Sequence, residues 1–333
     1  MVSFIEIENN LGTTVTLCNI GASIYDIKTK DKFNKNESIL YTTANMNDFP
    51  NNTSYLGKTI GRTGGRITNG EFEINGIKYK IPSKDPNGLH GGTDGLSFKP
   101  FLHKKIKRED YTEVEFFYES RDLESGYPGN FELRVIYRLY NDQNKLTIRY
   151  LGTTDKDTLV NLSNHAYFNL SGNAKNDILN HELYINSTKM ELLENMLPAK
   201  IVDEKEIYSF KKPHLIGDYI KDEEIIKSAN GYDFPYIFDD NEDYNVILKD
   251  KESKRVLKIK TTYPTVVVYT CNYTDDSIMN NNKVMTPYYA VCLECMYHPN
   301  TINSSFLKEK KDILKKDSMY DETIELYFEV ENE

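Results

Sequence analysis

The sequence predicts an all-β protein, built as a large antiparallel β-sandwich with few short helices. Three observations favour this class. Apolar and polar residues alternate with period two in many segments that are rich in β-branched and aromatic residues. Turn-forming pairs separate these segments, and stretches with a helical period are few and short, such as 219–229 and 307–315. Neither a Pro/Ser-rich linker nor a repeat of fixed period divides the chain, so we expect one domain over residues 1–333.

The predicted strands begin at the N-terminus. Residues 4–8 alternate apolar and acidic side chains, which indicates a strand rather than a signal peptide. Asn75-Gly76 lies between the alternating segments 72–74 and 77–81, and we expect a hairpin there because a type I′ turn needs positive φ at both central residues. The other alternating segments that we expect to form strands are 114–118, 131–137, 145–150 and 256–261.

The composition disfavours several classes of protein. A net charge of −10 disfavours binding to nucleic acid or an anionic membrane, because that affinity comes from Lys and Arg that neutralise phosphates. No uninterrupted apolar stretch approaches the roughly 20 residues that span a bilayer. The four cysteines, at positions 18, 271, 292 and 295, are too few for a disulfide scaffold. We therefore expect a cytoplasmic protein with reduced thiols that binds neither nucleic acid nor a membrane.

His90 lies in a glycine-rich segment, residues 87–92. The flanking glycines let the backbone take tight conformations and give a ligand close approach. A histidine in such a loop is often structural as well. The segment by itself therefore leaves both a binding role and a structural role open.

His165 lies in a segment with an unusual polar face. If residues 159–170 form a strand, alternation places four hydrogen-bonding side chains on one face: Asn161, Ser163, His165 and Tyr167. Such a face suggests a polar cleft, with a solvent-facing strand as the equal alternative. A histidine titrates near neutrality, and an adjacent carboxylate would favour its protonated form.

Glu294 is the only charged residue in the apolar segment 290–297. A carboxylate is costly to bury unless it is paired or functional, and burial would raise its pKa toward that of a usable base. The alternative is a glutamate on an edge strand that faces water. The segment therefore makes Glu294 a candidate catalytic residue without settling its role.

Two further motifs look like known kinds of site. Cys292 and Cys295 have the spacing of a zinc or redox pair, but residues three apart on a strand point to opposite faces and no second pair follows. We therefore expect no metal. Residues 61–66 are glycine-rich but lack the terminal Lys-Ser/Thr of a phosphate-binding loop, and Arg62 and Arg66 are their more informative residues.

Taken together, these motifs resemble those of the aldose 1-epimerase (galactose mutarotase) family. The matching segments extend over nearly the whole chain, from about residue 21 to residue 306. They are residues 60–67, 88–92, 125–130, 161–172, 231–233, 268–270 and 293–299. The combination of Asn-His-x-Tyr-Phe-Asn-Leu with Leu-His-Gly-Gly, in this order, is highly specific.

By this resemblance, the protein is expected to be a mutarotase that interconverts the α and β anomers of free aldoses such as galactose or glucose. Glu294 would act as the general base and His165 as the general acid, while His90, Arg66 and Asp233 would bind sugar hydroxyls. The family uses no metal or organic cofactor and folds as a galactose mutarotase-like supersandwich, with the site in a cleft on the concave side. We expect a monomer or homodimer whose partner is a small-molecule aldose.

The chain departs from the family pattern at four positions. The residues that differ are Gly65 (usually Asn), Phe234 (commonly His), Met296 (Gln) and Phe101 (Trp). These changes would remove polar groups near the expected sugar pocket, so the preferred aldose need not be galactose. Two alternatives stay open, which are an epimerase of sugar phosphates and a catalytically silent sugar-binding protein.

Overall fold

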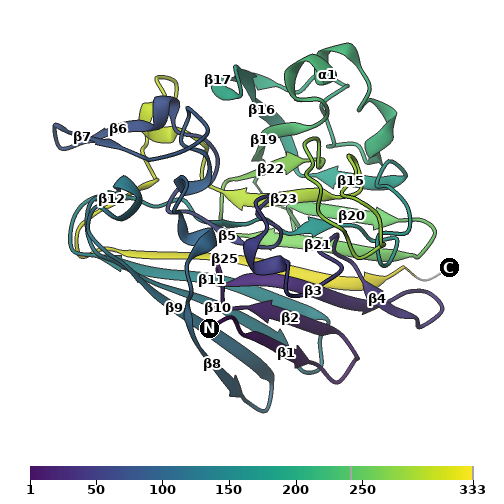
Figure 1. Ribbon diagram of the computed structural model, residues 1–333. Helices are drawn as coiled ribbons and strands as arrows, with labels where there is room; N and C mark the ends of the chain where they lie inside the picture. The colour runs from purple at the N-terminus through teal and green to yellow at the C-terminus, as the bar shows by residue number, and fades with distance from the viewer. Residues whose placement is uncertain (241, 332–333) are drawn as a thin grey trace.

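The computed structural model describes residues 1–240 and 242–331, and Figure 1 shows its strands arranged in layers. A nine-stranded antiparallel sheet has the order β18-β15-β20-β21-β25-β11-β10-β9-β8. A six-stranded antiparallel sheet has the order β14-β23-β22-β19-β16-β17, and a four-stranded sheet the order β1-β2-β3-β4. One cluster of buried apolar side chains draws on all three sheets. The predicted all-β antiparallel sandwich is therefore confirmed.

The bounds of the elements are as follows. The nine-stranded sheet contains β8 (Leu102–Lys107), β9 (Tyr111–Ser120), β10 (Phe131–Tyr140), β11 (Lys145–Thr154), β15 (His181–Ile185), β18 (His214–Leu215), β20 (Val246–Asp250), β21 (Arg255–Thr261) and β25 (Met319–Val330). The six-stranded sheet contains β14 (Tyr167–Phe168), β16 (Ser187–Glu194), β17 (Leu197–Asp203), β19 (Asp233–Phe238), β22 (Thr265–Tyr269) and β23 (Val291–Met296). The four-stranded sheet contains β1 (Phe4–Glu8), β2 (Thr14–Cys18), β3 (Ser23–Lys30) and β4 (Asn36–Ser38). Shorter pairs join β5 (Thr59–Ile60) to β13 (Ser163–Asn164), β6 (Glu71–Ile74) to β7 (Ile77–Lys80), and β12 (Thr158–Leu159) to β24 (Ile313–Leu314).

Helices are short and lie between the strands. The 3₁₀ turns are Phe49–Asn51, Thr68–Gly70, Leu89–Gly91, Leu96–Phe98, Glu124–Gly126, Ile216–Asp218 and Thr301–Asn303. The α-helix α1 spans Glu223–Ala229, after Asp222, whose carboxylate accepts the Glu224 N–H as an N-cap. The helix predicted around 219–229 is thus present in its C-terminal part. No helix among the described residues has the length and apolar character needed to cross a membrane.

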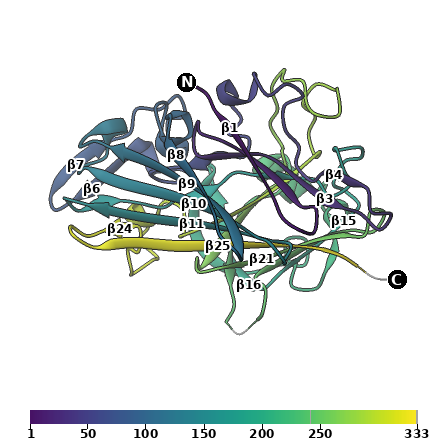
Figure 2. The same ribbon diagram turned by 90° about the horizontal axis from the view of Figure 1, so that it is seen from below.

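The alternating segments build the core as expected. In β10, every second side chain from Phe131 is buried, and the residues between them are exposed or half-buried. Val135 faces Phe116 of β9 and Tyr150 of β11, so three neighbouring strands point large apolar groups to the same side. The segments predicted as strands lie within β1, β9, β10, β11 and β21. Figure 2 shows β9, β10, β11 and β25 side by side in the long sheet.

The predicted hairpin at Asn75-Gly76 is confirmed. Ile74 of β6 faces Ile77 of β7, which leaves two residues for the turn. Their φ angles are 53° and 79°, as a type I′ turn requires.

The helix predicted around 307–315 is wrong. This segment is irregular until Ile313–Leu314, which pairs with β12. Lysines 308, 311 and 315 would share one helical face, where like charges at spacings of three and four residues repel. Lys310 instead donates to the carbonyl oxygens of Thr301 and Ser304 at 2.5 Å each, which favours the irregular backbone.

Candidate active site

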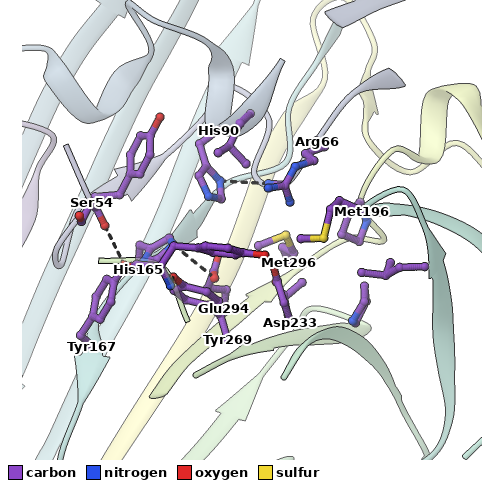
Figure 3. Close-up of a pocket in the computed structure, with 18 of the residues that line it drawn as sticks. Ser54, Arg66, His90, His165, Tyr167, Met196, Asp233, Tyr269, Glu294 and Met296 are labelled. Carbon is purple, nitrogen blue, oxygen red and sulfur yellow. Dashed lines mark hydrogen bonds and ion pairs between the residues drawn. The ribbon is translucent and has the colours of Figure 1, made fainter. Parts of the chain in front are cut away.

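A cavity of about 350 Å³ opens on the six-stranded sheet. The five residues predicted for the site all line it, and they are Arg66, His90, His165, Asp233 and Glu294. Figure 3 shows the His165 imidazole beside Glu294, with Arg66, His90 and Asp233 around the same space. The fold therefore brings together every residue that the sequence suggested for this site.

Four neighbouring strands supply one wall of the cavity, in the order β14-β23-β22-β19. Glu294 of β23 faces Val267 of β22, and Asp233 of β19 faces Tyr269 of β22. On the other side of β23, Tyr167 of β14 is in register with Cys292. Because side chains on a strand alternate, Cys292 and Glu294 point to the same face of β23.

Hydrogen bonds of the backbone fix His165 between β13 and β14. Its N–H donates to the Lys58 carbonyl and its carbonyl accepts from the Gly57 N–H, both at 2.9 Å. Nε2 lies 3.5 Å from Glu294 Oε1. The imidazole also packs against the rings of Tyr167 and His90, with centroids 5.1 and 5.2 Å away.

The polar face predicted for residues 159–170 is only partly realised. The segment is not one continuous strand but contains two short ones, β13 and β14, and its side chains are buried on both sides. Asn161 forms hydrogen bonds with the backbone of Tyr297, and Ser163 does not line the cavity. Of the four predicted face residues, His165 and Tyr167 line the cavity. Alternation fails as a guide here because the chain crosses between strands at these residues.

Burial dominates the ionisation of Glu294 and His165. It raises the pKa of Glu294 well above the usual range, and the charge of Asp233 adds to this while Arg66 opposes it. Burial lowers the pKa of His165 to about 4. This direction is opposite to the one expected from a nearby carboxylate, because the loss of hydration on burial is the largest cause of the shift. Burial therefore favours the neutral forms of both groups.

His90 is held by its backbone as well as by its ring. It has φ 49° and ψ 40° and is followed by Gly91 and Gly92. A Cβ at Gly91 would lie 1.9 Å from the Gly61 carbonyl oxygen, so this close approach requires glycine. His90 Nδ1 accepts the Gly65 N–H at 3.2 Å. Burial lowers the pKa of His90 well below the usual range, so the ring is neutral and its hydrogen lies on Nε2.

Three of the cavity side chains are close enough together to suggest a metal. Ligand atoms of His90, His165 and Glu294 lie within 4.8 Å of one another. A metal ligand must present a lone pair, and the Gly65 N–H already occupies that of His90 Nδ1 while Nε2 carries hydrogen. The set therefore suits hydrogen-bond donation by His90 better than coordination.

Arg66 and Asp233 complete the polar lining. Arg66 Nε lies 3.2 Å from Asp85 Oδ2. Asp85 was not predicted as a site residue, because no motif in the sequence marks it. Burial raises the pKa of Asp233 to about 6, and the Arg66 charge partly opposes this. The other arginine of the segment, Arg62, is buried and donates to Ser120 and to the Pro128 and Gly129 carbonyls, so its role is structural.

The four departures from the family pattern have different surroundings. Gly65 and Met296 line the cavity, and a Cβ at Gly65 would lie 2.9 Å from Pro299 Cβ. Phe234 is fully buried in the core and packs on Tyr208, with ring centroids 5.0 Å apart. Phe101 is also a core residue. The expectation that Phe234 alters the sugar pocket is therefore wrong, because it points away from the face of β19 that carries Asp233.

Comparisons with known proteins agree with this geometry. A family model described as aldose 1-epimerase matches residues 3–326. Galactose mutarotase from Homo sapiens is 28% identical over 323 residues, which cover 95% of this chain and 91% of that protein. Aldose 1-epimerase from Escherichia coli (strain K12) is 26% identical over 340 residues, which cover 97% and 94%. The crystal structure of an aldose epimerase homologue from C. elegans has a TM-score of 0.90 at 25% identity and covers all of both chains. That of galactose 1-epimerase from Lactobacillus acidophilus NCFM has a TM-score of 0.86 at 24% identity, covering 100% of this chain and 99% of that one.

Proposed function

Because the chain belongs to the aldose 1-epimerase family, it is an isomerase of aldoses, and we propose that Glu294 and His165 carry its two proton transfers. The observation that carries this proposal is the 3.5 Å contact between Glu294 Oε1 and His165 Nε2 inside the cavity. Conversion of one anomer into the other requires a proton to leave O1 while another reaches O5. A carboxyl and an imidazole that lie side by side can exchange both protons with a sugar whose O1 and O5 face them from the cavity.

The proposed reaction starts from the ring form of the sugar, with Glu294 as carboxylate and His165 as imidazolium. Glu294 takes the proton of the C1 hydroxyl, His165 gives its Nε2 proton to O5, and the C1–O5 bond breaks to leave an aldehyde. Rotation about the C1–C2 bond presents the other face of the aldehyde. Closure then runs both transfers in reverse. Each positioned transfer contributes about 10²–10⁴-fold to the rate.

The protonation state that burial favours for Glu294 and His165 is the one that this reaction requires when the sugar is in its open-chain form. Ring opening leaves Glu294 protonated and His165 neutral, which are the forms that burial favours. The bound ring form requires the single proton of the pair to lie on His165 instead. Arg66 assists this shift, because its charge lowers the pKa of Glu294. The pair thus stabilises the aldehyde stage, which is the highest-energy species in solution.

We propose that the other polar residues bind the sugar. The Nε2 hydrogen of His90 and the guanidinium of Arg66 are donors, and Asp233 is an acceptor for hydroxyl groups. Met196 and Met296 add apolar surface to the same cavity. A hydroxyl turned toward them would lose hydrogen bonds to water, at a cost of about 1–3 kcal/mol. Galactose and glucose are the first substrates to test, and the preferred aldose is one that turns a C–H face to the methionines.

A phosphorylated sugar fits the cavity less well. Among the described residues that line the cavity, Arg66 is the single lysine or arginine, and Asp85 already neutralises it. The cavity is also lined by the carboxylates of Asp233 and Asp275, whose charges repel a phosphate.

We propose a cytoplasmic location for the enzyme. All four cysteines are free and buried. Free thiols persist where the cell keeps a reducing environment, which supports the proposal.

The test is the rate of anomer exchange, followed by polarimetry or NMR with galactose, glucose, xylose, arabinose and galactose 6-phosphate. Glu294→Gln keeps the shape of the side chain and removes the base, so we expect a fall of about 100-fold or more. The matched control is Glu191→Gln, because Glu191 of β16 is also a fully buried carboxyl but lies outside the cavity. We expect this variant to keep the wild-type rate of anomer exchange.

Each alternative predicts a different result in the same assay. Exchange of the phosphate ester alone would indicate an epimerase of sugar phosphates. Thermal stabilisation by galactose with only the spontaneous exchange rate would indicate a sugar-binding protein. Near-wild-type activity of Glu294→Gln would exclude the proposed role of this residue.

A further inference from the structure

We infer that Cys292 is a positioning residue, whose sulfur accepts the Nδ1 hydrogen of His165 and so keeps Nε2 as the nitrogen that exchanges protons. This inference rests on the proposed function, in which Nε2 both gives and takes a proton. A neutral imidazole has one hydrogen, so Nε2 can accept a proton only when Nδ1 carries that hydrogen. A partner that accepts the Nδ1 hydrogen therefore favours the tautomer in which His165 can react.

Cys292 is well placed to be that partner. Its Sγ lies 3.5 Å from His165 Nδ1, within the range of a hydrogen bond to sulfur. Among the side chains of the described residues, it is the one hydrogen-bond partner of Nδ1. On the other side of the ring, Nε2 lies 3.5 Å from Glu294 Oε1.

The spacing along β23 explains how one strand addresses both nitrogens. Cys292 and Glu294 are two residues apart, so they project from the same face of the strand. The pairing of Cys292 with Tyr167 brings β23 beside β14, directly after His165. The imidazole is thus held between two side chains of a single strand, one at each nitrogen.

The direction of the hydrogen bonds follows from the proton content of the pair. Burial favours the protonated form of Glu294, so its O–H can donate to Nε2, which lies 3.5 Å from Oε1. Nδ1 then carries the ring hydrogen and donates it to sulfur. In the opposite arrangement, the thiol donates to Nδ1 and Nε2 holds the hydrogen, which leaves His165 unable to accept a proton from the O5 hydroxyl of the open chain.

A thiol differs from a carboxylate in this position. Burial raises the pKa of Cys292 well above its usual range, and Glu294 raises it further, so the group remains a neutral thiol. A carboxylate at Nδ1 would stabilise the imidazolium and raise the pKa of His165. The neutral sulfur orients the ring without doing so, and the imidazolium stays a strong enough acid to protonate O5, which is a weak base.

Other groups around the ring do not take this role. The titratable side chains that face His165 are Tyr55, His90, Tyr167 and Tyr269 through their rings, with Asp233 and Arg66 farther along the cavity. None of these forms a hydrogen bond with Nδ1 among the described residues. Their contacts with His165 are packing contacts between rings.

The experiment compares Cys292→Val with Cys295→Val. Cys295 is a matched control, since it is an equally buried thiol of β23 that points to the opposite face. Ring ¹⁵N chemical shifts at pH 7 distinguish the two tautomers, and the signals of His165 are those missing from His165→Asn. In the wild type and in Cys295→Val we expect hydrogen on Nδ1.

In Cys292→Val we expect the Nε2–H tautomer to appear and kcat to fall about 10-fold with little change of KM, as for other partners that orient a catalytic side chain. Cys292→Ser keeps an acceptor and should restore both readouts. Equal tautomers and rates in Cys292→Val and Cys295→Val would overturn the inference, as would hydrogen on Nε2 in the wild type. The second result needs no variant at position 292 to fold, and Glu294→Gln tests the proposed function separately.

Discussion

The two histidines of the cavity lie side by side and have opposite surroundings at Nδ1. Their ring centroids are 5.2 Å apart, and burial lowers the pKa of both. His90 Nδ1 accepts a backbone N–H from Gly65, which leaves its hydrogen on Nε2. His165 Nδ1 faces the thiol of Cys292, and its Nε2 faces Glu294. A backbone donor thus makes one imidazole a permanent hydrogen-bond donor, and we infer that a sulfur acceptor leaves the other free to exchange protons.

The largest expected effect distinguishes the reacting histidine from its neighbour. In His165→Asn, no group can give a proton to O5 or take it back, so kcat should fall about 100-fold or more. The backbone bonds of residue 165 do not depend on its side chain, so the fold should be kept. Polarimetric rates measure the effect, with circular dichroism as the check on folding. A fall of less than tenfold would mean that Nε2 of this histidine is not the acid.

The pH dependence of kcat/KM in the wild type tests whether His165 is the group that titrates in the pair. The pKa of His165 is about 4, so below that pH both members of the pair are protonated and no base remains for O1. The acidic limb of kcat/KM that belongs to the pair should therefore lie near pH 4. A histidine with an unperturbed pKa would place it near 6.5.

This comparison also shows which parts of the site the sequence could predict. The glycines around His90 signal a close backbone approach, and Gly91 indeed lies too near Gly61 for any Cβ. Glu294 could be found as the lone charge of an apolar strand. The partners at Nδ1 could not be found, since Cys292 and His165 are 127 residues apart and only the pairing of β14 with β23 joins them. Period-two spacing does place Cys292 on the face of Glu294, which was the one available signal.

The fold shows the same division between local and non-local information. Turn chemistry at Asn75-Gly76 and alternation along β10 and β11 are properties of short segments, and both predictions are confirmed. Alternation fails over residues 159–170, where the chain passes between strands and is buried all round. The order of strands in the two large sheets depends on contacts distant in sequence, which no local pattern contains.

A smaller effect is expected for the binding histidine. In His90→Asn, the backbone should keep its conformation, because asparagine tolerates the positive φ of 49°. The variant loses the Nε2 donor but leaves Glu294 and His165 in place. We expect KM to rise about 10-fold, the value of one hydrogen bond of about 1.4 kcal/mol, with kcat within about threefold. Equal losses of kcat in His90→Asn and His165→Asn would break the division of roles between the two rings.

The smallest effect concerns Asp233, the acceptor on the far side of the pair. Its native pKa of about 6 lies above the ordinary value of 3.8, so the native state favours the protonated carboxyl. Stability from this group is therefore full below about pH 4 and is lost as the pH rises through 6. Two pKa units correspond to about 3 kcal/mol, and because the side chain is only half-buried we expect about 1–2 kcal/mol.

Asp233→Asn should therefore raise the melting temperature by about 1–3 °C at pH 8 and leave it unchanged at pH 4. Calorimetry at the two pH values measures the difference. The same variant also distinguishes the titration of Asp233 from that of His165 in the pH dependence of kcat/KM. A limb near pH 6 belongs to Asp233 and should disappear, whereas the limb near pH 4 belongs to His165 and should remain. If the limb near pH 6 persists in Asp233→Asn, Glu294 or an imidazole titrates there instead of Asp233.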